Sequence, residues 1–159
     1  MSRSSIVLSP VHLTAIQNLL AQLGQQADVR CAFLGDLSGQ ELASWEGRAQ
    51  LDVSSLAALA AGDLMATMEI AQLLGGKRTC NLIVQEHDDM TILVSRVGEG
   101  LFLLLATAKD VPLGWSRLAI KRSAERILAL VGKAAMTPPP AAVNDDFVRN
   151  FAAHLDNIW

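Results

Sequence analysis

Cysteine is scarce in this chain of 159 residues, which contains only Cys31 and Cys80. Two cysteines so far apart form neither a disulfide framework nor the closely spaced pairs that bind zinc. The three histidines, His12, His87 and His154, fall in different predicted elements, and none has a second metal-binding side chain at ligand spacing. The sequence therefore predicts no metal and no other cofactor, and it predicts two free thiols buried in strands.

Charge is also low, with 18% charged residues, a net charge of -3 and an apolar fraction of 51%. This balance gives no general reason to expect nucleic acid as a partner. A basic streak at Arg117, Lys121, Arg122 and Arg126 has helical spacing, which is typical of a solvated helix face, and an anion or acidic-lipid patch is the alternative. So apolar a composition predicts that part of the surface meets a partner.

Uninterrupted apolar runs are missing as well. No window of about 18 apolar residues is free of charge, because Asp63 and Glu69 interrupt the most apolar stretch. Residues 1–10 lack the basic start and the long apolar core of a signal peptide. We therefore expect no membrane span and a cytoplasmic location.

Motifs that carry chemistry are absent or incomplete. No serine sits in a nucleophile elbow, and the adjacent Asp88 and Asp89 have the pattern of turn residues. Residues 75–79 resemble a phosphate-binding loop, but Ala71 stands where the motif requires glycine, and the segment leads from a helix into a strand. These gaps favour a binding module without catalytic residues over an enzyme.

What the chain does contain is a long apolar helix over residues 51–76, with only three charges and no basic residue until Lys77. Its large apolar side chains recur all around the helix axis, whereas a surface helix has a single apolar stripe. They are Leu56, Leu59, Leu64, Met68, Ile70, Leu73 and Leu74. At 1.5 Å per residue this helix is about 35 Å long, too long to be hidden in one small domain. We expect one face to pack on its own sheet and the other on a second chain.

The remaining pattern predicts an α+β domain in the order helix, two strands, helix, three strands, helix. The first helix covers 10–27, and the long helix begins at Asp52 or Ser54 and ends at Gly75-Gly76. Short apolar runs bounded by turn residues predict a hairpin and then a three-stranded meander. These runs cover 29–34, 42–45, 80–85, 91–97 and 101–107, and the last helix covers 113 to about 135. The expected architecture is a five-stranded antiparallel sheet with helices on both faces.

The C-terminal end is predicted to be separate from this domain, which covers 1–136. Three consecutive prolines within 137–143 form a stiff linker, and 144–159 has the pattern of a short amphipathic helix capped by Asn144. Such a helix is too short to be stable alone, which is typical of docking helices. Its anchors are Phe147, Phe151, Leu155 and Trp159. A tail folded back over its own sheet or dimer is the alternative.

Several fragments, taken with this order of elements, resemble the Roadblock/light-chain-seven family, and within it the bacterial MglB-like regulators of a small Ras-like GTPase. The resemblance spans residues 6–134, and its fragments agree with the family in order and spacing. They are 33–39 in the hairpin, 55–62, 66–67 and 73–75 on the long helix, and 112–114, 117–118 and 121–125 on the last helix.

The resemblance implies a homodimer in which the long helices pack together and the neighbouring third strands pair. The interface residues expected on this basis are Leu56, Leu59, Leu64, Met68, Cys80 and Leu82. Small residues on the long helix permit close approach of a partner, and the resemblance makes that partner an MglA-like GTPase. The expected GTPase-binding residues are Ala58, Ala61, Gly62, Met65, Ala66 and Glu69.

In this family the regulator favours the hydrolytic arrangement of the GTPase and contributes no catalytic side chain, while C-terminal extensions can promote nucleotide exchange. An arginine inserted into the GTPase site is the rival mechanism, and Arg48 in a loop is the candidate. Two other functions stay open. One is a passive scaffold that localises a GTPase or motor component, and the other is a secretion chaperone.

Overall fold

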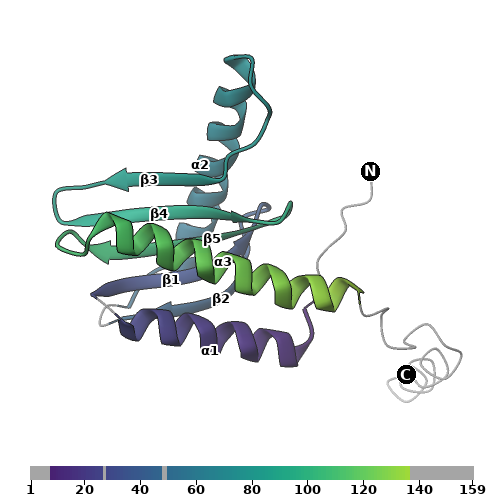
Figure 1. Cartoon of the computed structure of the whole chain (residues 1–159), viewed down its shortest axis with the longest axis vertical. Helices are drawn as coiled ribbons and strands as arrows, with labels where there is room; N and C mark the ends of the chain where they lie inside the picture. Colours follow the sequence, from purple (N-terminus) through teal and green to yellow (C-terminus); the bar gives the residue numbers. More distant parts are fainter. Residues whose placement is uncertain (1–7, 27, 48–49, 137–159) are drawn as a thin grey trace, which may run out of the picture.

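The computed structural model describes residues 8–26, 28–47 and 50–136, with the side chains of 133–136 excepted. These residues form three helices and five strands in the order that the sequence predicts (Figure 1). The elements are α1 (Pro10–Gln26), β1 (Val29–Asp36), β2 (Glu41–Glu46), α2 (Val53–Leu73), β3 (Leu82–Glu86), β4 (Met90–Val97), β5 (Leu101–Ala108) and α3 (Leu113–Met136). The predicted linker 137–143 and helix 144–159 lie outside the described residues.

The five strands form one antiparallel sheet in the order β2-β1-β5-β4-β3, so β2 and β3 are its edges. The central strand β5 is buried from Leu101 to Thr107, which explains its unbroken apolar run. One predicted boundary is wrong. The third strand begins at Leu82, where pairing with Ser95 of β4 starts, so Cys80 precedes the strand.

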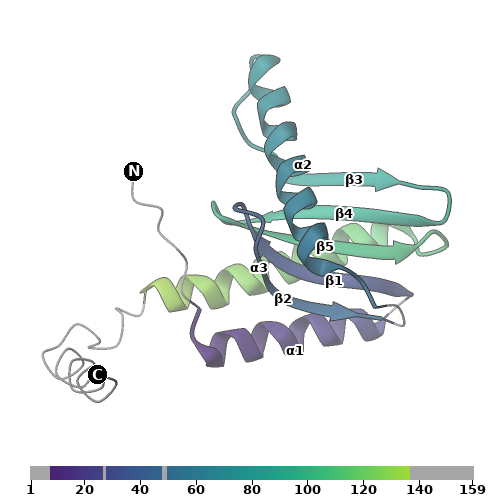
Figure 2. The ribbon, with the colours of Figure 1, turned by 180° about the vertical axis from the view of Figure 1, so that it is seen from behind.

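Helices cover both faces of the sheet, as predicted. Helices α1 and α3 lie side by side on one face, and α2 crosses the other face (Figures 1 and 2). Because side chains alternate along a strand, β1, β3, β4 and β5 contribute to two separate cores, while β2 contributes to the α1 and α3 side. The core on the α2 side contains Phe33 and Phe102, whose rings meet edge to face with centroids 6.0 Å apart.

Both ends of α2 are defined by the residues that the sequence indicates. The carboxylate of Asp52 accepts a hydrogen bond from the backbone N–H of Ser55 at 3.1 Å and another from its hydroxyl, which together lower the pKa of Asp52. At the other end Gly75 has a φ of +85°, and the N–H groups of Gly75 and Gly76 bond to the carbonyls of Gln72 and Ala71. This is a Schellman motif, in which glycine is favoured because its φ is positive.

Close contact between α1 and β2 depends on Gly24. A Cβ added to Gly24 would overlap the ring of Trp45, so Gly24→Ala forces the indole to move. We expect this variant to lose about 1 to 2 kcal/mol of unfolding free energy, an overpacking cost reduced by the better helix propensity of alanine. The matched control is Gly132→Ala in α3, which meets open space and should gain up to about 1 kcal/mol. Urea denaturation measures both, and equal stability of the two variants would contradict this packing.

Candidate partner-binding surface on helix α2

Helix α2 extends beyond its own sheet. It crosses the sheet and continues past the edge strand β3, and the chain then returns to β3 through residues 74–81 (Figures 1 and 2). The protruding end carries bare apolar side chains, with Leu73 85%, Leu74 83% and Ile70 56% exposed. So much exposed apolar surface at one place on a small domain is typical of an interaction site.

The protruding end is tied to the returning chain by polar contacts. Arg78 Nε donates to Glu69 Oε1 at 2.5 Å, and Gln85 Nε2 of β3 donates to Asp63 Oδ2 at 2.6 Å. The first pair is solvated and adds little stability. These contacts nevertheless orient the end of α2 relative to β3, so that the helix and the strand edge present one joint surface.

One stripe of α2 faces the sheet and has no surface left for a partner. It recurs every three or four residues and consists of Val53, Ala57, Ala60, Ala61, Leu64 and Met68. Leu64 lies fully buried in the core with Phe33 and Phe102. Three predicted contact residues therefore lie on this stripe, namely Ala61 of the GTPase set and Leu64 and Met68 of the dimer set.

The exposed side of α2 has two flanks. At about 100° per residue, Ala58, Gly62, Met65 and Glu69 lie on one flank within an arc of about 60°, and all four are exposed. A Cβ on Gly62 would meet no heavy atom within 4 Å. This flank is therefore low and open, as contact with a partner's backbone requires.

The opposite flank and the crest between the two flanks are more apolar. Leu56 and Ile70 lie on the opposite flank, while Leu59, Ala66 and Leu73 lie on the crest. Leu59 is 71% exposed, and Leu56 is partly buried against the core below α2. Together the flank and crest provide the outer apolar face that the sequence predicts for α2.

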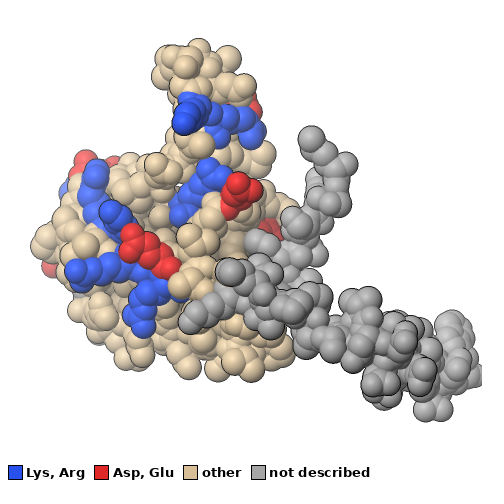
Figure 3. All heavy atoms as spheres, turned by 45° about the vertical axis from the view of Figure 1, so that its right-hand side comes forward, with Lys and Arg blue, Asp and Glu red and all other residues tan. Residues whose placement is uncertain are grey.

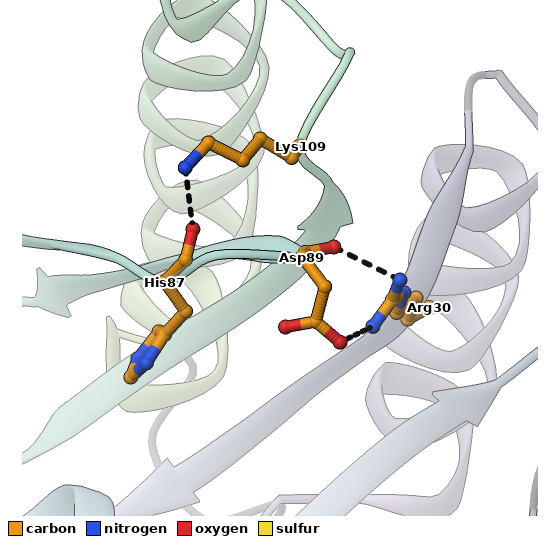
Figure 4. A network of polar contacts seen from close by, with 4 residues as sticks. All are labelled: Arg30, His87, Asp89 and Lys109. Carbon is orange, nitrogen blue, oxygen red and sulfur yellow. Dashed lines mark hydrogen bonds and ion pairs between the residues drawn. The ribbon is translucent and has the colours of Figure 1, made fainter.

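Strand β3 presents the second part of this surface, because no strand pairs with its outer edge in the described part of the chain. Arg30 of β1 fastens its turn by donating to the carbonyl of Asp89 at 2.9 Å, and Lys109 donates to the carbonyl of His87 at 2.9 Å (Figure 4). Asp89 thus belongs to a turn, as predicted. An open edge held in place in this way is a template for another strand.

The two thiols differ in their surroundings. Cys31 of β1 is buried, and this burial raises its pKa to about 11. Cys80 lies beside the β3 edge and is only half-buried, and burial raises its pKa as well. The prediction of a buried strand thiol is therefore confirmed for Cys31 and wrong for Cys80, because the chain is still returning from α2 at that position. No group of three potential metal ligands occurs among residues 8–26, 28–47 and 50–136.

This difference predicts selective alkylation. At pH 8, and at a protein concentration low enough to keep protomers separate, we expect iodoacetamide to modify Cys80 at least about tenfold faster than Cys31, since the thiolate is the reactive form and Cys31 is both enclosed and protonated. Mass spectrometry of peptides over a time course measures the two rates. Protein in guanidinium chloride is the control, in which both cysteines should react alike. Equal rates in the native protein would contradict the burial of Cys31.

Helix α2 is long and apolar enough, by length and composition alone, to cross a membrane. The core helix of a soluble protein passes the same test. Here the stripe that contains Ala57 and Leu64 is buried against the sheet, and Asp63 accepts a hydrogen bond from β3. The apolar character of this stripe is thus accounted for by contacts within the protomer.

Sequence reasoning missed part of this surface. Ile70, Leu73 and Leu74 belong to the most exposed apolar group on α2, yet they are absent from the predicted contact residues. Their signal was present, since apolar residues directly before the Gly75-Gly76 stop indicate a helix end without polar protection. Arg48 and the predicted anchors Phe147, Phe151, Leu155 and Trp159 lie outside the described residues.

Comparison with known proteins agrees with this architecture. The family model described as Roadblock/LC7 domain matches residues 15–107. The gliding protein MglB from Thermus thermophilus is 27% identical, with a TM-score of 0.75 over 83% of this chain and 99% of that one. A structure titled "MglB with tetrameric arrangement" is 28% identical, with a TM-score of 0.76 over 84% and 99%.

Myxococcus xanthus MglB is 25% identical, with a TM-score of 0.73 over 80% of this chain and 95% of that one. Among curated proteins none matches this chain. The matched region runs from α1 through β5 and so includes the whole sheet and the protruding helix α2. This chain belongs to the Roadblock/LC7 domain family.

Proposed function

We propose that the protein is a cytoplasmic, homodimeric regulator that binds a small MglA-like Ras-family GTPase and stimulates its GTP hydrolysis. The observation that carries this proposal is the protruding helix α2, whose exposed face is apolar on its crest and low on one flank. Similarity to two MglB structures of known organism supports the choice of partner. The choice of a GTPase as the partner rests on the family resemblance.

Two features on the same side of the protomer support the dimer, an unpaired strand edge and an uncovered apolar helix end. Strand β3 offers an unpaired edge among the described residues, and the end of α2 next to it carries Leu73 and Leu74 uncovered. If two copies pair their β3 edges, each protruding helix end extends over the partner's sheet, and both features are completed together. Leu56, Leu59, Cys80 and Leu82 remain proposed interface residues.

The GTPase-binding surface is proposed to be the low flank together with Ala66 of the crest, with Ala58, Gly62, Met65, Ala66 and Glu69 in contact. Small side chains let a partner's backbone come close, and Met65 provides an adaptable apolar contact. Glu69 is already paired with Arg78, so it offers a fixed polar position. The paired β3 strands would place two such flanks on one side of the dimer.

Stimulation without a catalytic side chain is then a matter of selective binding. A surface that binds the hydrolysis-competent conformer of the GTPase more tightly than its ground state accelerates turnover by that difference in free energy. Insertion of Arg48 is the rival route. The predicted helix 144–159 is proposed to add nucleotide exchange through a second contact with the GTPase.

The deciding experiment is a single-turnover GTP hydrolysis assay with the full chain and an MglA-like small GTPase. We expect a rate increase that saturates with the concentration of the dimer. A passive scaffold would bind the GTPase and leave the rate unchanged. A secretion chaperone would bind an unfolded segment and ignore the folded GTPase.

A further inference from the structure

A groove lies on the other face of the sheet, beside α3. Its volume is about 480 Å³. It runs between α3 and the ends of β3 and β4 that lie beyond this helix (Figure 1), and Val97, Ile120 and Ala124 are buried at its floor. The apolar groups that line it are Leu82, Val97, Ile120, Ala124 and Leu128, and the last of these is 46% exposed. The exposed apolar part of the groove is therefore formed by Leu128 and the half-buried Leu82.

Basic side chains rim this groove. Arg96 extends from β4, and Arg117 and Lys121 extend from α3, with Glu125 as the only acidic lining residue. Figure 3 shows basic side chains gathered around acidic ones on this side of the molecule. An occupant of matching chemistry is an amphipathic helix with a large apolar face and acidic groups beside it.

We propose that the groove binds the chain's own C-terminal segment, residues 144–159, on the same protomer. The predicted helix carries Phe147, Phe151 and Leu155 on one face. This inference does not depend on the proposed function, because it concerns a contact that forms without any GTPase. It gives the segment a position on its own protomer when no GTPase is bound, in a groove of which only Leu82 is also a proposed dimer residue.

The connection is long enough. Helix α3 runs about 12 Å from Leu128 to its end at Met136. The seven residues 137–143 span about 22 Å if they adopt the polyproline conformation that their prolines favour. The segment can therefore turn back beyond the end of α3 and enter the groove next to Leu128, running antiparallel to α3.

The spacing of apolar residues agrees in this antiparallel arrangement. Groove residues Leu128, Ala124 and Ile120 recur every four positions on α3. The anchors Phe147, Phe151 and Leu155 have the same spacing in the opposite direction. Because Ile120 and Ala124 are buried at the floor of the groove, Leu128 is the exposed apolar contact on α3: Phe147 covers it, and Phe151 lies over the floor at the small Ala124.

The charges agree in the same register. Asp156 comes next to Arg117 and Lys121, and Arg149 comes next to Glu125. At the far end Trp159 reaches Arg117, whose guanidinium can stack on the indole. The basic streak on α3, expected from the sequence to be a solvated face, then has a defined partner for its two members in the groove.

A disulfide trap tests the position of the segment in the full chain. In a Cys80→Ser background we combine Lys121→Cys with His154→Cys, two polar positions that face each other in this register. The matched control combines Arg122→Cys with His154→Cys, because Arg122 is adjacent in sequence but lines the seam between α3 and α1. Oxidation is followed by non-reducing electrophoresis and peptide mass spectrometry, without any GTPase.

We expect the Lys121 pair to form a disulfide within one protomer at least about tenfold faster than the Arg122 pair. Adding Leu128→Glu, a change at an exposed position, should slow the Lys121 pair at least about fivefold. Three results would overturn the proposal: equal rates for the two pairs, a disulfide between protomers, or no effect of Leu128→Glu. Loss of GTPase stimulation would leave the proposal standing, so the two failures are distinguishable.

Discussion

We expect the double variant Leu73→Glu, Leu74→Glu to sediment as a monomer at micromolar concentrations where the parent chain is a dimer. Each leucine is more than 80% exposed in the protomer, so the interface is where its apolar surface would be buried. Four leucine side chains per dimer, at about 1.5 kcal/mol each, correspond to about 6 kcal/mol and a 10⁴-fold weaker dimer. Sedimentation equilibrium measures the dissociation constant directly.

The matched control for this variant is Val11→Glu on α1. Val11 is also apolar and 77% exposed, and it lies on the opposite side of the sheet from α2. We expect it to leave the dimer intact. Circular dichroism should show the same helix content in all three proteins, since none of these side chains belongs to a core. A parent chain that is monomeric at these concentrations would remove the basis of the proposed dimer.

The sequence predicted the fold well because its local signals agree with one another. The boundaries of α2 follow from Asp52 and Gly75, residues whose backbone roles are specific. The unbroken apolar run of β5 follows from its central place in the sheet. The start of the third strand was placed too early, at Cys80, because the apolar run begins before the pairing does. Residues 74–81 return along α2, and pairing with β4 starts only at Leu82.

The site was harder to predict because composition does not reveal which side of an apolar helix faces the sheet. Leu64 and Leu59 look equivalent in the sequence, yet Leu64 is completely buried and Leu59 is 71% exposed. The difference depends on the rotation of α2 about its axis, which is fixed by packing on Phe33 and Phe102. The groove beside α3 was likewise invisible, since it results from how far α3 lies from the edge of the sheet.

The low flank of α2 gives the sharpest test of GTPase binding. We expect Gly62→Arg to reduce the stimulation of GTP hydrolysis at least about 100-fold while the dimer persists. A Cβ at Gly62 meets no heavy atom of the protomer within 4 Å and the position is exposed, so arginine adds bulk and charge on the side open to an incoming partner. Single-turnover hydrolysis with the full chain measures the loss, and sedimentation checks the dimer.

Gly62→Ala is the control that separates contact from folding. Alanine in mid-helix should raise the unfolding free energy by about 1 kcal/mol and leave the stimulation within about threefold of the parent, because a methyl group does not fill the flank. A glycine retained only for packing within the protomer would give the opposite order, with Gly62→Ala destabilised. If Gly62→Arg stimulates hydrolysis as strongly as the parent chain, the GTPase must bind elsewhere, and Ala66 on the crest becomes the position to change next.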